Sequence, residues 1–159
     1  MPAQLQVILW TTVVALVIAP FVVIGLADQT EKPILLIIGD SVGARLNSEG
    51  RDVLDQWGDT YTIYTYAVGG STSADTLLFL SRANLQADTV LCFLGANDEL
   101  RGESDGLKDR VTSIRAAFKS EFIWVDTRSS ATPNCSGCKT DGLHLTQRGY
   151  TELAEQLAL

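Results

Sequence analysis

The sequence predicts an α/β fold, in which helices cover both faces of a parallel, flavodoxin-like sheet and form a three-layer α/β/α sandwich. Two observations carry this prediction. Strand-like apolar runs alternate with helix-like segments over residues 34–159, and the joints between them are short. The chain has 159 residues, which is room for one domain. One hydrophobic helix is expected to precede the sandwich.

The N-terminal segment carries the strongest apolar signal. The first 27 residues contain no ionisable side chain, and residues 7–27 are almost wholly apolar. As a helix they would span roughly the 30 Å of a bilayer core. A single-pass anchor, a cleaved signal peptide and a buried core helix all fit. The segment lacks a signal peptide's basic start, and the remaining residues form a complete pattern without it. We therefore expect 1–27 to be a transmembrane anchor or signal segment.

Four segments predict strands. Residues 34–40 and 88–95 are continuous apolar runs, which is typical of strands buried on both faces of a parallel sheet. Residues 60–68 are rich in β-branched and aromatic side chains. Residues 122–126 form the fourth expected strand.

Helical spacing of apolar residues follows each strand. Residues 46–57 carry the first such pattern, which Gly50 interrupts. The turn over 69–73 is suited to cap a second helix, and Thr146 is a suitable N-cap for the last. The apolar positions of the last three helices are Leu77, Leu78 and Leu85, then Leu107, Val111, Ile114 and Phe118, then Tyr150, Leu153 and Leu157.

The formal net charge of −7 belongs entirely to residues 28–159, because the first 27 residues carry none. A domain this acidic is unsuited to hold nucleic acid or anionic lipid by electrostatic attraction. We therefore expect no nucleic-acid partner.

Cys135 and Cys138 form a CxxC pair shortly before Asp141. Redox work, half a zinc site, a structural disulfide and a pair of reduced thiols are the alternatives. Zinc would need two further ligands, and Cys92 lies within an apolar run. A disulfide in an oxidising compartment is the favoured interpretation. A lone Lys32 after the apolar segment leans weakly the other way, toward a cytoplasmic domain.

Residues with chemical potential follow the predicted strand ends. Ser41, Gly70 and Asn97 come after the first three strands, and the carboxyl ends of parallel strands share one edge of a sheet. Asp141 and His144, the only histidine, lie in the last loop. A serine becomes a useful nucleophile when a base takes its proton and a third group orients that base. These residues therefore predict ester chemistry through an activated serine.

Four blocks of the sequence resemble the SGNH (GDSL-type) hydrolase superfamily. They are GDSV at 39–42, AVGGSTS at 67–73, GAND at 95–98 and DGLHLT at 141–146. The blocks reach from end to end of residues 28–159, so the resemblance implies that this whole segment is a small, membrane-anchored or exported hydrolase domain.

The resemblance also assigns roles. Ser41 would be the nucleophile, His144 the general base, and Asp141 the residue that orients His144. The backbone N–H groups of Ser41 and Gly70, with Gly69 as the alternative, and the side chain of Asn97 would form the oxyanion hole. No metal or other cofactor is implied. Thr65 stands where many members have an asparagine, which puts that side chain's loop hydrogen bond in doubt.

The expected activity is hydrolysis of a small, acetyl-like ester on a carbohydrate of the cell envelope. Transfer of the acyl group to a sugar, lysophospholipase or thioesterase action, and a non-catalytic binding module are the alternatives. The CxxC pair resembles that of periplasmic SGNH domains appended to membrane acyltransferases. We expect a single-pass protein of the inner membrane, held through residues 7–27 with its catalytic domain in the periplasm, or a secreted protein after signal cleavage.

Overall fold

The structure is a computed structural model that describes residues 31–128 and 135–159. The predicted anchor over 7–27 lies outside the described residues. Among the helices that the structure describes, none has the length and apolar character needed to cross a membrane. Residues 32–159 form one compact unit.

Four parallel strands form the sheet. They are β1 (Ile34–Gly39), β2 (Thr62–Ala67), β3 (Thr89–Leu94) and β4 (Glu121–Asp126), and their order is β2-β1-β3-β4. This order is that of the first four strands of flavodoxin-like sheets. β1 and β3 occupy the centre and are almost completely buried, whereas residues of the edge strand β2 are alternately exposed and half-buried. The predicted α/β fold with a parallel sheet is confirmed.

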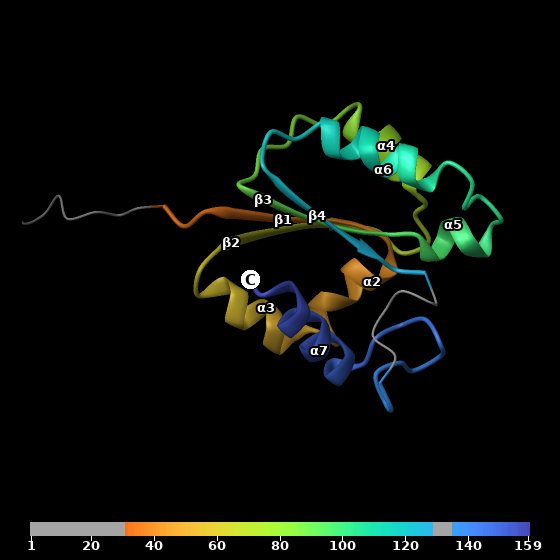
Figure 1. The fold of residues 1–159 in the computed structure, drawn as a ribbon. Helices are drawn as coiled ribbons and strands as arrows, with labels where there is room; N and C mark the ends of the chain where they lie inside the picture. Colours follow the sequence, from red (N-terminus) through yellow and green to blue (C-terminus); the bar gives the residue numbers. More distant parts are fainter. Residues whose placement is uncertain (1–30, 129–134) are drawn as a thin grey trace, which may run out of the picture. The chain divides into compact units, whose positions relative to one another are not determined.

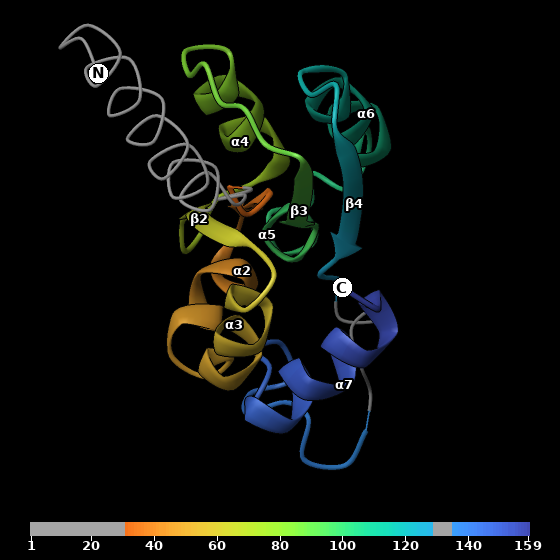
Figure 2. The ribbon, with the colours of Figure 1, turned by 90° about the vertical axis from the view of Figure 1, so that its left-hand side faces the viewer.

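Helices lie on both faces of this sheet, as Figures 1 and 2 show. α3 (Arg51–Gly58) and α7 (Gln147–Leu157) cover one face, and α4 (Ser73–Leu80) and α6 (Leu107–Ala116) cover the other. Two short helices follow strand ends: α2 (Ser41–Ala44), which continues into a 3-10 turn over Arg45–Asn47, and α5 (Ala96–Leu100).

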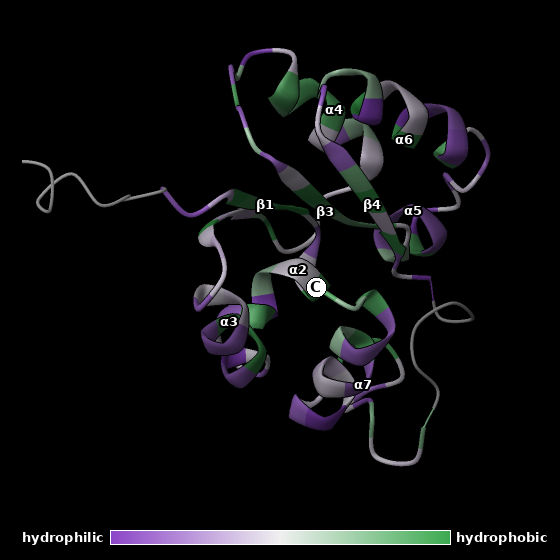
Figure 3. Cartoon of the chain, turned by 60° about the vertical axis from the view of Figure 1, so that its left-hand side comes forward, coloured by the Kyte–Doolittle hydropathy of each residue, from purple (hydrophilic) through white to green (hydrophobic). Residues whose placement is uncertain are grey.

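Alternate side chains of the central strands point to opposite faces and form two cores. Leu35, Ile37, Leu91 and Phe93 pack with α3 and α7 residues such as Trp57 and Tyr150. Leu36, Ile38, Val90 and Cys92 pack with α4 and α6 residues such as Leu80 and Ile114. Figure 3 shows the apolar residues concentrated in the central strands.

The helix pattern differs from the sequence prediction in three places. α6 ends at Ala116, so Phe118 lies just beyond the helix, where it still packs against the core on that face. α4 ends at Leu80, so Leu85 lies in the loop before β3, where it still packs against the core on that face. Its apolar character therefore reflects burial and not a third turn of helix. The sequence also gave no helical signal for α5, because five residues are too few to show a period. The interruption at Gly50 is confirmed, since α3 begins directly after it.

Candidate active site

The candidate site lies at the carboxyl edge of the sheet, where the strand order reverses between β1 and β3. Such switch points are where ligands bind in open α/β sheets. Gly39 ends β1 with a φ of +125°, and a Cβ there would lie 1.9 Å from the carbonyl oxygen of Phe93. Glycine therefore permits both the close approach of β1 to β3 and the sharp turn into α2. That turn places Ser41 as the first residue of α2.

Ser41, His144 and Asp141 form one hydrogen-bonded chain across 100 residues of sequence. Nδ1 of His144 lies 2.7 Å from Oδ2 of Asp141, and Nε2 lies 3.0 Å from Oγ of Ser41. A carboxylate can only accept, so Nδ1 carries the ring proton and Nε2 is left as an acceptor for the Ser41 hydroxyl. The predicted residues are thus brought together in the arrangement that proton transfer from serine to histidine needs. Their catalytic roles stay predictions.

Asp141 is held by its own loop as well as by the imidazole. Its Oδ1 accepts hydrogen bonds from the backbone N–H groups of His144 at 2.8 Å and Leu143 at 3.2 Å. The imidazole N–H, and then these backbone groups, keep the pKa of Asp141 well below its usual value. The carboxyl group is half exposed, whereas the His144 side chain is 17% exposed. Asp141 is therefore ionised at any working pH and offers His144 a permanent acceptor.

The loop that presents His144 is joined to the cysteine pair. Cys135 and Cys138 form a disulfide, as predicted, whereas the oxidising compartment stays a prediction. Cys138 is fully buried, and its carbonyl accepts a hydrogen bond of 2.9 Å from the N–H of Thr146. Residues 139 and 145 pair as an antiparallel bridge, and Thr140 N–H donates to the His144 carbonyl at 2.9 Å. The disulfide thus lies at the base of the hairpin that carries His144.

We expect reduction of this disulfide, or a double change Cys135→Ser/Cys138→Ser, to lower activity more than melting temperature. A loop with two residues between its cysteines removes little entropy from the unfolded chain, but a displacement of ~1 Å at His144 can cost about a hundredfold in rate. Parallel measurements of kcat and Tm check this. A Tm loss without a rate loss would contradict it. The control is Cys92, whose thiol is buried and has a raised pKa, and which should react only after denaturation.

The groups expected to form an oxyanion hole belong to Ser41, to the glycine turn over residues 69–70 and to Asn97. Asp40 is the N-cap of α2 and accepts a hydrogen bond from the Val42 N–H at 2.9 Å. Ser41 supplies the first N–H of α2, and the first N–H groups of a helix have no partner within the helix. Gly69 lies against Ser41, since a Cβ at Gly69 would be 3.9 Å from that of Ser41. Gly70 has a φ of +83°, which favours glycine.

The side chain of Asn97 is held in place by a hydrogen bond to the glycine turn. Its Nδ2 donates to the Ser71 carbonyl at 2.9 Å, which uses one of the two amide hydrogens and leaves the other for a ligand. An Arg101 guanidinium N–H donates to the Gly70 carbonyl at 2.9 Å. Asn97 and Arg101 are thus both hydrogen-bonded to the glycine turn. The role of Ser41, Gly70 and Asn97 as oxyanion donors stays a prediction.

The sequence reasoning missed a buried ionic cluster beneath these donors. Asp98 is fully buried and accepts from the Ser73 N–H at 3.0 Å, the Ser73 hydroxyl at 2.5 Å and the Arg110 guanidinium at 3.0 Å. It joins α5, which carries Asn97, to the start of α4 and to α6. The only signal was the aspartate of the GAND block, because the sequence does not show that Arg110 lies beside it.

Asp40 is a second buried carboxyl group. Burial raises its pKa to about 6, against hydrogen bonds from Thr127 and Val42 that lower it, and nearby Asp98 raises it further. The group has an ordinary pKa of 3.8, so the folded protein holds this proton more tightly than the unfolded chain does. At a pH below the ordinary pKa, Asp40 therefore makes its full contribution to the free energy of unfolding. This contribution is lost as the pH rises through the pKa that Asp40 has in the folded protein.

We expect Asp40 alone to lower the free energy of unfolding by about 2 kcal/mol between pH 4 and pH 7. Urea denaturation of the wild type and of Asp40→Asn at both pH values measures this. The stability of the wild type relative to the variant should fall as the pH rises. A constant or rising difference would show that the Asp40 pKa is not raised.

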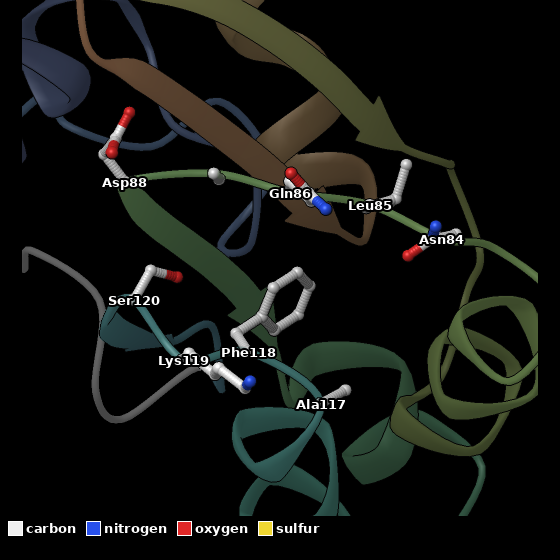
Figure 4. Close-up of a pocket in the computed structure, with 9 residues that line it drawn as sticks. Asn84, Leu85, Gln86, Asp88, Ala117, Phe118, Lys119 and Ser120 are labelled. Atoms are coloured by element: carbon white, nitrogen blue, oxygen red, sulfur yellow. The ribbon is translucent and has the colours of Figure 1, made fainter.

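Among the hollows of the described domain, two lie at opposite ends of the sheet. One of about 140 Å³ borders the glycine turn and is lined by Gly39, Tyr66, Val68, Ser71, Asp75, Thr76 and Phe79. The other, of about 490 Å³, lies between the loops before β3 and β4 and is lined by residues 84–88 and 117–120 (Figure 4). These loops precede their strands, so the second hollow is at the opposite end of the sheet from Ser41. Within the described residues, no three potential metal ligands cluster together.

Solved structures share this fold, although no family model and no curated protein sequence matches the chain. TesA has a TM-score of 0.60 against this chain, with 19% identity over 79% of this chain and 96% of TesA. The esterase EstA from a Pseudoalteromonas species, solved with monoethylphosphonate as inhibitor, has a TM-score of 0.55 and 16% identity over 80% of this chain and 95% of EstA. An acetyl xylan esterase from Geobacillus stearothermophilus has a TM-score of 0.50 and 16% identity over 77% of this chain and 91% of its own.

These similarities show that the chain shares its α/β fold with the three solved structures.

Proposed function

We propose that this protein is a serine ester hydrolase of the SGNH type. The observation that supports the proposal most is the hydrogen-bonded chain from Ser41 through His144 to Asp141. In the proposed reaction His144 takes the hydroxyl proton as the Ser41 oxygen attacks the ester carbonyl. The protonated His144 then gives that proton to the leaving alcohol, and water releases the acyl group from Ser41 by the same steps.

Asn97 and the N–H groups of Ser41 and Gly70 would stabilise the oxyanion. Such donors act on charge that exists only in and near the transition state. We expect Asn97→Ala to lower kcat by about 10²- to 10³-fold with little change in KM. Steady-state kinetics separates the two constants. An increase in KM with unchanged kcat would make Asn97 a substrate-binding residue instead.

A small acyl group is the proposed substrate moiety. The hollow beside the glycine turn has about 140 Å³, close to a cavity of about 150 Å³ that holds benzene. That volume suits a short acyl chain and is too small for a long fatty chain. An acylated carbohydrate of the cell envelope remains the proposed substrate, and one fold relative is an acetyl xylan esterase.

The proposed location is the inner membrane, with the catalytic domain in the periplasm. Two observations support it: the disulfide, which persists in oxidising compartments, and the uncharged apolar segment over residues 7–27. A secreted form after signal cleavage is the alternative.

The test uses the full chain in detergent with p-nitrophenyl esters of increasing chain length and Ser41→Ala as the control. We expect acetate to be preferred over octanoate and all turnover to depend on Ser41. Preference for octanoate would favour lysophospholipase or thioesterase action, and acyl-sugar formed from an added sugar would show transfer. A phosphonate ester should add to Ser41, as seen by mass spectrometry. Absence of both turnover and adduct would indicate a binding module.

A further inference from the structure

The two short helices of the site are capped in different ways. α2, which begins with Ser41, is capped by its own neighbour Asp40. α5, which carries Asn97, has Gly95 as its N-cap, and glycine has no side chain to offer. The first N–H of α5, that of Ala96, donates instead to Oγ1 of Thr127 at 2.9 Å. Thr127 directly follows β4, so α5 is capped by a residue from the loop after a neighbouring strand.

The same Thr127 hydroxyl is also hydrogen-bonded to Asp40, the N-cap of α2. It donates to Oδ2 of Asp40 at 2.6 Å, while Oδ1 of Asp40 accepts from the Val42 N–H. Thr127 and Asp40 are both fully buried. The hydroxyl thus accepts from one helix and donates to the cap of the other, which fixes its orientation. The Thr127 backbone is itself tied to β3, through a bond of 3.1 Å from its N–H to the Leu94 carbonyl.

We propose that Thr127 is a positioning residue, whose hydroxyl aligns Asn97 with Ser41 by joining the caps of their two helices. The inference rests on the proposed function. The first bond holds Ala96, the residue directly before Asn97. The second bond holds Asp40, the residue directly before Ser41. An oxyanion donor displaced by ~1 Å can cost about a hundredfold in rate.

Thr127→Val separates the hydroxyl from the packing, because valine has nearly the same shape. The change leaves the Ala96 N–H buried without an acceptor and Asp40 with one donor fewer. In the full chain in detergent, we expect Thr127→Val to lower kcat by 10- to 100-fold with KM within about twofold. Thr127→Ser, which keeps the hydroxyl, should stay within about threefold of the wild type. The matched control is Thr89→Val, a buried threonine at the opposite end of β3, which should leave kcat unchanged.

Combining the Thr127 and Asn97 variants distinguishes a positioning role of Thr127 from a general structural role. In an Asn97→Ala background there is no amide left to align and only the link through Asp40 to Ser41 is lost, so Thr127→Val should cost clearly less than it does in the wild type. An undiminished loss in that background, or failure of Thr127→Ser to retain activity, would overturn the proposal. If Thr127→Val does not fold, Thr127→Ala in the same two backgrounds gives the same comparison.

Amide hydrogen exchange gives a readout that does not depend on activity. Thr127→Val should speed exchange at Ala96 by at least tenfold relative to Thr89→Val, because the Ala96 N–H loses its acceptor. Unchanged exchange at Ala96 would overturn the link between the caps. A wild type that hydrolyses no ester would instead overturn the proposed function, so the two failures are distinguishable.

Discussion

Replacement of Ser41 or His144 by alanine is expected to lower kcat by about 10⁴-fold or more, and the double variant should be hardly worse than either single one. The two side chains are joined by a 3.0 Å hydrogen bond and act in the same step, namely transfer of the hydroxyl proton. Once either partner is missing, the other has nothing to act on, so the losses do not add.

The measurement is kcat for p-nitrophenyl acetate with the wild type, the two single variants and the double variant. Ser48→Ala is a suitable control, because Ser48 is exposed and bonds only within its own turn. Its kcat should equal that of the wild type. Additive losses at Ser41 and His144 would show that the two residues do not share a step. Circular dichroism confirms that each variant is folded.

The elements that the sequence predicted best are those whose burial is complete. β1 and β3 read as unbroken apolar runs because both of their faces are covered, and the structure places them within one or two residues of the predicted bounds. The residues at the strand ends could be predicted to share an edge because the sheet is parallel. The parallel topology was therefore enough to predict that Ser41, Asn97 and the glycine turn lie at the same edge of the sheet.

The parts that could not be predicted depend on contacts between distant residues. Thr127 has no local signal, since its role comes from lying 2.6 Å from Asp40, 87 residues earlier in the sequence. The buried pair of Asp98 and Arg110 likewise requires α6 to pack beside α5. Leu85 was assigned to a helix because an apolar residue at a suitable interval looks the same whether helix or loop buries it.

Asp141→Asn is expected to lower kcat by about 10⁴-fold. Asp141 uses one oxygen for the imidazole N–H and the other for the backbone N–H groups of its own loop. Asparagine has a single oxygen, so it can satisfy the ring or the loop but not both. If its NH₂ group faces the imidazole, the ring must accept at Nδ1 and carry its proton at Nε2. The Ser41 hydroxyl then has no base.

His144 is the only histidine in the chain, so ¹⁵N NMR reports this tautomer directly from a single ring. In the wild type the spectrum should show a protonated Nδ1 and an unprotonated Nε2 at pH 8, and Asp141→Asn should shift the population toward the opposite tautomer as kcat falls. Asp109→Asn, an exposed carboxylate on α6, is the control and should change neither. A variant Asp141→Asn that kept both the tautomer and near-normal kcat would show that the loop alone orients His144.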